Sequence, residues 1–384
     1  MNCVRCLTQF KAPPLRVDSS VREAPAGPRR GDEAASGAPP PESTSTVTVT
    51  KELRVATKMI LDCDPGHDDA IAILLALGSP QIDLLGITTI GGNHSLEKVT
   101  YNARAVCELA GRPELPVHAG CMRPLVREAI DAAYIHGQTG LDGVDLPEPS
   151  RPLPGQHAVT WIIETVMSHE PGTITVVATG PLTNIAMAAR MEPRIVGRLK
   201  EIVLMGGAYG VGNATPVAEF NILCDPEAAH IVFNENWPLT MIGLDVTHQA
   251  LCTPEVQRVI SAACSGTPGL ADAVSGLMDF FRSTYQDQEA FPDPPTHDPC
   301  AVAYVIDPSL IPTRRCPVDV ELRGGLTYGM TVADLRALSA SPRDSGDSCT
   351  SQVGVGLETG RFWALVASAL ADLGRPARAG AASE

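Results

Sequence analysis

Two patterns of apolar residues alternate along the chain from about residue 53 onward. Short apolar runs, typical of buried parallel strands, are followed by stretches in which apolar residues recur every three or four positions, as in a helix that covers a sheet. The expected strands are a run that begins at Met59, then Ile82–Ile90, Pro116–Ala119, Ile174–Ala178, Glu201–Met205, Leu239–Leu244 and, at a sheet edge, Gln352–Leu357. The expected helices include one after Gly66, then Leu96–Leu109, Ala158–Ser168, Pro226–Asn234, Leu270–Gln288, one after Asp298, and Arg361–Leu373. This alternation predicts an α/β fold with an open, mostly parallel central sheet flanked by helices and a Rossmann-like core.

Residues 1–52 have a different composition from the rest of the chain. Pro, Ala, Gly, Ser and Thr dominate the stretch from Ala24 to Thr50, and no apolar period is sustained. We expect a disordered extension here and one folded domain over residues 53–384. The extension lacks the apolar core of a secretory signal, and its acidic residues do not favour a mitochondrial-targeting signal.

Four aspartates follow the first predicted strand within eight residues: Asp62, Asp64, Asp68 and Asp69. Carboxylates this close repel one another, and partial burial would raise their pKa values unless a cation were present. Oxygen ligands without His or Cys at metal-ligand spacing favour a hard cation, Ca²⁺ or Mg²⁺. In the alternative interpretation Asp68 and Asp69 only cap the following helix, which leaves Asp62 and Asp64 unexplained.

Several other strands also end in small or polar residues. Asn93 follows the second strand, Thr179 follows the strand that ends at Ala178, and Gly206 follows Met205. Because the carboxyl ends of parallel strands meet at one sheet edge, these residues and the aspartates are expected to share a crevice. No GxGxxG or Walker loop is present, so a nucleotide-phosphate cradle is not supported.

Two further groups of polar residues lie downstream. Glu219 and Asn221, in a region with little sign of regular structure, would suit the hydroxyl groups of a sugar, although solvated loop polarity is an equal alternative. His297 and Asp298 precede Pro299 at a predicted helix start. Asp298 could be a plain N-cap there, or the pair could supply a proton donor and a metal ligand.

Composition and charge exclude several classes of protein. The formal charge of −15 argues against a nucleic-acid-binding surface, and no apolar run is long enough to span a membrane. The 11 cysteines are scattered without a disulfide framework, and the CxxC at Cys3 and Cys6 has no second pair to complete a zinc site. These features predict a soluble protein of a reducing compartment, the cytoplasm.

The motifs together resemble the nucleoside hydrolase family, most closely its inosine–uridine-preferring members. The resemblance runs from about Lys58 to Leu373. It rests on segments that occur in the family's order: Asp62–Asp69, Asn93, Ile135–Gly137, Thr179–Asn184, Val203–Gly207, Val217–Asn221 and His297–Cys300. The resemblance implies a single catalytic domain that hydrolyses the N-glycosidic bond of ribonucleosides such as inosine and uridine, giving ribose and free base. It also implies a homodimer or homotetramer.

The resemblance further implies a role for each matching residue. Ca²⁺ would be held by Asp64, Asp69, the backbone carbonyl of Thr179, and Asp298. Asp64 would take a proton from the calcium-bound water, and His297 would protonate the departing purine. The residues around the ribose would be Asp68, Asn93, Met205, Asn213, Glu219 and Asn221.

Two alternatives come from other classes of protein. The first is a haloacid-dehalogenase-like phosphatase, because Asp62-Cys63-Asp64 at a strand end resembles that family's DxD motif. Gly66 stands where that chemistry needs Thr or Val, and the required downstream Lys and acidic pair cannot be located. The second is a protein that binds nucleosides or ribose without turnover, against which the presence of Asp64 and His297 argues.

Overall fold

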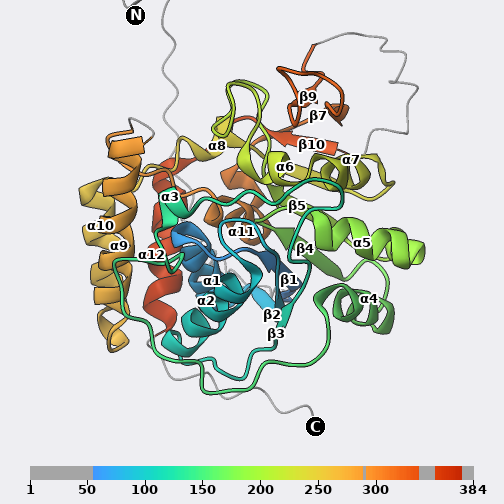
Figure 1. Ribbon diagram of the computed structural model, residues 1–384. Helices are drawn as coiled ribbons and strands as arrows, with labels where there is room; N and C mark the ends of the chain where they lie inside the picture. Colours follow the sequence, from blue (N-terminus) through green and yellow to red (C-terminus); the bar gives the residue numbers. More distant parts are fainter. Residues whose placement is uncertain (1–54, 289–290, 337–350, 374–384) are drawn as a thin grey trace, which may run out of the picture. The chain divides into compact units, whose positions relative to one another are not determined.

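An eight-stranded sheet forms the centre of the computed structural model (Figure 1). The structure describes residues 55–288, 291–336 and 351–373. The strand order is β3-β2-β1-β4-β5-β6-β10-β7, and all neighbouring strands are parallel except β10 and β7. The strands are β1 (Thr57–Cys63), β2 (Ile82–Thr89), β3 (Val117–Ala119), β4 (Ile174–Ala178), β5 (Glu201–Met205), β6 (Leu239–Ile242), β7 (Thr313–Arg315) and β10 (Ser351–Gly354). The predicted α/β class with a mostly parallel sheet is confirmed.

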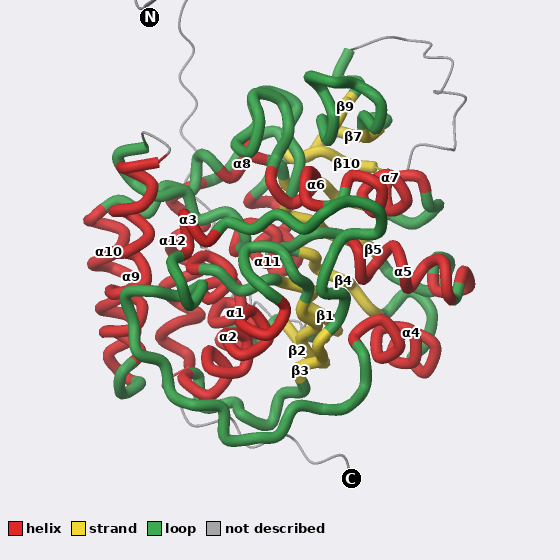
Figure 2. The backbone as a smooth tube through the Cα atoms, in the orientation of Figure 1, coloured by secondary structure: helices red, strands yellow, loops and turns green. Residues whose placement is uncertain are grey.

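Helices flank this sheet and connect its strands. They are α1 (His67–Gly78), α2 (Leu96–Leu109), α3 (Ala133–His136), α4 (Ala158–Ser168), α5 (Thr183–Met191), α6 (Phe220–Cys224), α7 (Pro226–Asn234), α8 (Leu244–Thr247), α9 (Pro254–Ala263), α10 (Leu270–Gln288), α11 (Pro299–Ile306) and α12 (Thr359–Leu373). In Figure 1, α9, α10 and α12 lie together on the side of α1 and α2, whereas α4 and α5 lie on the opposite side. Figure 2 shows that the connection from β3 to α4 is almost entirely loop, with only α3 within it.

Each strand contributes to two cores, one on each face of the sheet. In β1, Met59 and Leu61 pack with residues of α1, α10 and α12, whereas Ile60 between them packs with residues of α4 and α5. Successive side chains of a strand point to opposite faces, so a strand covered on both faces must be apolar at every position. The continuous apolar runs of the sequence follow from this double burial.

The strand order fixes the position of the site. The chain moves outward from β1 through β2 to β3, then returns to the other side of β1 at β4 and continues to β5 and β6. The connections that leave the carboxyl ends of β1 and β4 therefore run in opposite directions, and a crevice opens between them. Asp64 follows β1 and Thr179 follows β4, so both lie at this reversal of the strand order.

Three details differ from the sequence predictions. The strand β10 does not lie at the edge, because the three polar residues of β7 pair with it in antiparallel orientation on the outside. Leu244 begins the short helix α8 and does not belong to β6. The helix α9 and the antiparallel pair β8 (Val318–Val320) and β9 (Thr331–Ala333) lie in stretches for which no element was predicted.

The prediction of a disordered extension over residues 1–52 lies outside the described residues. Within the part of the chain that the structure describes, no helix is both long enough and apolar enough to cross a membrane. The cysteines described there are unpaired, and most of them are buried.

Candidate active site

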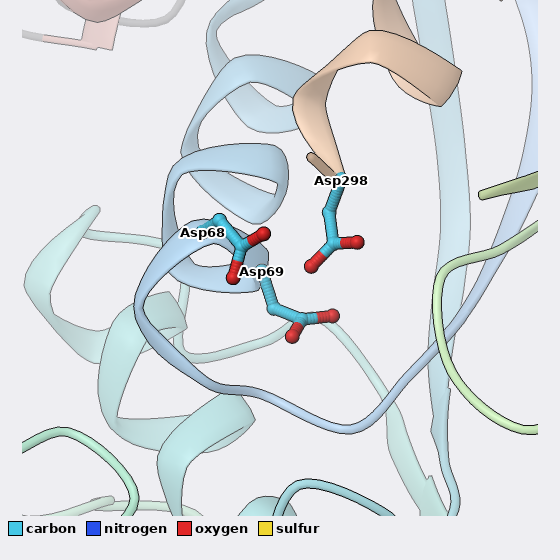
Figure 3. A group of neighbouring side chains, drawn as sticks. All are labelled: Asp68, Asp69 and Asp298. Carbon is cyan, nitrogen blue, oxygen red and sulfur yellow. The ribbon is translucent and has the colours of Figure 1, made fainter. Parts of the chain in front are cut away.

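The turn between β1 and α1 brings three carboxyl groups together with a fourth from a distant segment. Asp64 follows β1, and Asp68 and Asp69 lie in the first turn of α1. Asp298, at the start of α11, faces them across the crevice, as Figure 3 shows for Asp68, Asp69 and Asp298. Asp68, Asp69 and Asp298 each offer a carboxylate oxygen within 4.8 Å of the others, and all three side chains are buried. The predicted ligand set contained Asp64 where this close group contains Asp68.

Helix capping does not account for these carboxyl groups. Asp298 occupies the N-cap position of α11, yet its side chain makes no capping hydrogen bond. Asp69 accepts a hydrogen bond from the backbone N–H of Gly66 at 3.0 Å, but its other oxygen accepts one from Oγ1 of Thr179 at 2.9 Å. The cap-only interpretation of Asp68 and Asp69 is therefore insufficient, since Asp69 also connects α1 to the end of β4.

Asp64 has one fixed oxygen and one unpartnered oxygen. Its Oδ2 accepts a 2.6 Å hydrogen bond from the backbone N–H of Asn93, whereas Oδ1 is buried without a hydrogen-bond partner. The carboxylate lies directly against the backbone at Gly92 and Gly180, where a Cβ atom would overlap it. The absence of a side chain at Gly92 and Gly180 therefore makes room for the Asp64 carboxylate.

Burial makes the charged form of these groups costly. Burial and the neighbouring Asp69 raise the pKa of Asp64 well above its usual range. Burial and neighbouring aspartates likewise raise the pKa of Asp298 well above its usual range and that of Asp68 to about 7. A hard divalent cation would remove this repulsion and would supply a partner for the orphaned oxygen of Asp64. The residues present therefore fit a metal ion bound through oxygen atoms.

A single cavity collects most of the predicted site residues. It is lined by Asp68, Asn93, Thr179, Met205, Asn213, Glu219, Asn221, His297 and Asp298. Of the predicted residues, Asp64 and Asp69 do not line it, but the side-chain amide of Asn93 donates to the carbonyl of Asp64 and to Oδ2 of Asp69. The two aspartates therefore lie directly behind the cavity wall.

The expectations for Glu219 and Asn221 need correction. Glu219 is the N-cap of α6 and Asn221 lies in that helix, so the expectation of a loop is wrong for Asn221. Solvated loop polarity is also wrong, because Glu219 and Asn221 are 2% and 6% exposed. Glu219 accepts hydrogen bonds from the backbone N–H groups of Gly207, Asn221 and Ile222. Its carboxylate is therefore held rigidly, and burial raises its pKa to about 7.

His297 is buried and hydrogen-bonded through both ring nitrogens. Nδ1 lies 2.7 Å from Oγ1 of Thr247, and Nε2 lies 2.9 Å from the hydroxyl of Tyr285. Its backbone N–H donates to Oδ2 of Asp68, which fixes the start of α11 against α1. Burial and the nearby His248 lower the pKa of His297 to about 3, so the ring is neutral at neutral pH.

The remaining wall of the cavity contains residues outside the predicted set of catalytic, metal-binding and ribose-binding residues. Tyr134, Ile135 and His136 come from α3 and its surroundings, and Phe281 and Tyr285 come from α10. His136 was part of a matching motif, but no spacing rule connects a four-residue helix in a long loop with α10. Only tertiary packing brings these rings together.

Comparison with known proteins gives the class to which this site belongs. The family model described as inosine-uridine preferring nucleoside hydrolase matches residues 59–364. The inosine-uridine preferring nucleoside hydrolases of Leishmania major and Crithidia fasciculata are 56% and 55% identical, and in each case the match covers 83% of this chain and 99% of the relative. The chain therefore belongs to the inosine-uridine preferring nucleoside hydrolase family.

More distant relatives and a solved structure agree with this class. A pyrimidine-specific ribonucleoside hydrolase of Escherichia coli is 45% identical over 80% of this chain and 95% of its own length. The structure of a purine-preferring ribonucleoside hydrolase from Gardnerella vaginalis superposes with a TM-score of 0.76 at 35% identity, covering 83% of this chain and 99% of that one. The protein is an enzyme that hydrolyses the N-glycosidic bond of ribonucleosides, and the phosphatase alternative is wrong.

Proposed function

We propose that this enzyme cleaves both purine and pyrimidine ribonucleosides, such as inosine and uridine, in the cavity at the carboxyl ends of β1, β4 and β5. The observation that carries the proposal is the convergence in one buried cavity of carboxylates, side-chain amides and an imidazole. A ribose offers several hydroxyl groups that donate and accept hydrogen bonds, and such a wall can pair with them.

The ribose would be held by Asp68, Asn93, Met205, Asn213, Glu219 and Asn221. Several of these side chains are already fixed by the protein: Asn221 donates to the carbonyls of Thr179 and Met205, and Asn213 accepts from the backbone N–H of Phe220. Preorganisation of these side chains lowers the entropic cost of reaching the transition state. The carboxylates would also stabilise the positive charge that develops on the sugar ring.

The metal ion would be Ca²⁺, with Asp64, Asp69, the carbonyl oxygen of Thr179 and Asp298 as its protein ligands. Several carboxylates and a backbone carbonyl form a typical ligand set for Ca²⁺, whereas Mg²⁺ usually keeps several waters and uses one or two carboxylates. When bound, the ion would supply a Lewis acid that orients the ribose hydroxyls and makes water more acidic. Asp64, with its unpartnered Oδ1, would accept the proton of the attacking water.

His297 would protonate the departing purine. Its ring borders the cavity and is hydrogen-bonded to Tyr285, which borders the cavity as well. The imidazole of His297 is neutral before substrate binds. The negative charge that develops on the leaving base would raise the pKa of His297 and so favour its role as a proton donor. Pyrimidine leaving groups need not depend on this residue to the same degree.

Removal of a single sugar hydroxyl tests the proposal. Inosine and uridine should release ribose, whereas 2′-deoxyinosine should react on the order of 10⁴-fold more slowly, since a site built to bond a hydroxyl is left with unpaired buried polar groups. Equal rates for inosine and 2′-deoxyinosine would contradict the proposed ribose contacts.

The quaternary structure and location stay predictions. We propose a homodimer or homotetramer in the cytoplasm, in keeping with the family resemblance and the unpaired cysteines of the described residues. Light scattering coupled to size exclusion measures the first directly, and a monomer at micromolar concentration would contradict it.

A further inference from the structure

His67, the first residue of α1, lies buried among three other rings. Its imidazole stacks on Phe280 at 5.2 Å and on Phe281 at 5.3 Å between ring centroids, with interplanar angles of 7° and 5°. It also stacks on His136 at 5.4 Å and 17°. His67, in α1, thus contacts both α10 and α3.

Both ring nitrogens of His67 are used. Nε2 lies 2.9 Å from the carbonyl oxygen of Asp142, and Nδ1 lies 3.1 Å from Nδ1 of His136. The backbone N–H of His67 points at the same His136 nitrogen from 3.3 Å. A hydrogen bond between two ring nitrogens needs a proton on one and a lone pair on the other, so it links both the orientation and the tautomer of His136 to His67.

The loop that His67 contacts through Asp142 is itself closed. The carboxylate of Asp142 accepts from the backbone N–H groups of Gln138 and Thr139, each at 2.9 Å, and from the Thr139 hydroxyl at 2.5 Å. Gly137 has a φ of 77°, which suits glycine, and a Cβ there would overlap the same carboxylate. Residues 137–142 therefore form a preformed unit that the His67 ring attaches to α1.

Two of the rings that His67 contacts line the active-site cavity. His136 and Phe281 both belong to its wall, whereas His67 does not. His136 is only 5% exposed, and its Nε2 has no hydrogen-bond partner among the described residues. An unpartnered nitrogen on a buried ring beside the cavity is available to a polar group of the bound base.

We propose that His67 is a positioning residue for the nucleobase: it holds the His136 ring, the loop 137–142 and the Phe281 face in one arrangement, so that Nε2 of His136 meets a ring N–H or ring nitrogen of the base. The inference rests on the proposed function, because it assigns the base to this wall of the cavity. His67 itself does not touch the substrate.

The test compares substrates with and without a nucleobase. Inosine carries the base that His136 would contact, whereas 4-nitrophenyl β-D-ribofuranoside carries an activated leaving group without ring nitrogens. His67→Phe keeps a stacking ring and removes both hydrogen bonds. We expect kcat/KM for inosine to fall by on the order of 10²-fold, mainly through KM, with the nitrophenyl riboside changed less than about threefold.

Two further variants separate positioning from general stability. His118 is also buried and stacks on a ring, that of Trp161 at 4.7 Å, and bonds to a carbonyl, that of Gln156 at 3.0 Å, yet it does not line the cavity. His118→Phe should lower the melting temperature without changing the ratio of the two substrates. In a His136→Ala background, His67→Phe should cause no further loss on inosine, because a residue acting through His136 has nothing left to orient.

Equal losses on both substrates, or fully additive losses in the double variant, would overturn the inference. If His67→Phe does not fold, His67→Gln is used for the same comparison. The Gln amide can keep one of the two hydrogen bonds, so this variant should retain more inosine activity than His136→Ala. Failure of the proposed function would look different: the wild-type enzyme would then release no ribose from inosine.

Discussion

The backbone N–H of Asn93 holds Oδ2 of Asp64 at 2.6 Å, and the same carboxylate keeps Oδ1 buried without a hydrogen-bond partner. One oxygen thus fixes the orientation of the carboxylate while the other stays open. A general base needs both properties, because it must be positioned and must still have a lone pair to receive a proton.

Replacement of Asp64 should cost more than replacement of His297. Asp64→Asn removes both a proposed metal ligand and the proposed base, so we expect a loss in kcat beyond the roughly 10²–10⁴-fold of one acid–base group on inosine and on uridine. His297→Ala should lower kcat on inosine within that range and affect uridine less. Steady-state rates on the two substrates check this, and equal losses for both variants on both substrates would contradict it.

Gly92→Ala should impair the enzyme without touching substrate. Its added Cβ would overlap Oδ2 of Asp64 and would lie 2.8 Å from Cδ of Pro181, so the carboxylate must move. A displacement of this size can cost on the order of 10²-fold in rate. Gly155→Ala is the matched control, because nothing lies within 4 Å of its added Cβ. Rates that fall equally in both variants would show that the glycine at 92 has no special role.

Asp298→Asn should raise the melting temperature of the metal-free protein. The side chain caps no helix, and burial beside Asp68 and Asp69 raises the pKa of its carboxyl group well above the usual range. Folding at neutral pH therefore costs the uptake of a proton by Asp298, a cost that Asn does not carry. We expect an increase of roughly 2–4 °C, corresponding to about 1 kcal/mol. Scanning calorimetry in EDTA measures it.

Asp225 provides the opposite control, because its carboxylate does cap a helix. It accepts hydrogen bonds from the backbone N–H groups of Ala228 and Leu125 and from the hydroxyl of Thr183. Asp225→Asn should therefore cost about 1–3 kcal/mol in the free energy of unfolding. If both variants destabilise the metal-free protein, the account of Asp298 as a non-capping residue is wrong.

Calcium should stabilise the wild-type protein and not Asp298→Ala. A ligand that binds only the folded state at a hundred times its Kd adds about 2.7 kcal/mol, so the melting temperature should rise by several degrees. Thermal melting in EDTA and in excess CaCl₂ reports the difference. An equal rise for wild type and Asp298→Ala would mean that calcium binds elsewhere.

The elements of the fold could be predicted from the sequence wherever a strand or helix is long and buried. The apolar runs at β1, β4 and β5 and the three- to four-residue periods of α2 and α10 were sufficient, because double burial leaves a pattern in the residues themselves. The three-residue strand β7, with the sequence Thr-Arg-Arg, leaves no such pattern, and its pairing with β10 is a long-range contact.

The site divides in the same way. Asp62 lies within β1, and Asp64, Asp68 and Asp69 follow that strand closely, so the spacing of the last three predicts that they lie together. Asn93 and Thr179 follow neighbouring strands of the same sheet. The contact of His67 with His136 and Phe281 could not be predicted, because it depends on how a long loop and α10 pack against the start of α1. Local patterns therefore predict the aspartates and the residues that follow the strands, whereas only tertiary packing brings the rings of His67, His136 and Phe281 together.

The most direct test of the central claim is ribose release from inosine and uridine by the wild-type enzyme and by Asp64→Asn, with the calcium content of both proteins measured. We predict release by the wild-type enzyme, loss of release in EDTA, and near-complete loss in Asp64→Asn even when excess CaCl₂ is supplied. Undiminished release by a folded Asp64→Asn would contradict the assignment of Asp64 as the proton acceptor. No release by a folded, calcium-bound wild-type protein would instead contradict catalysis at this site.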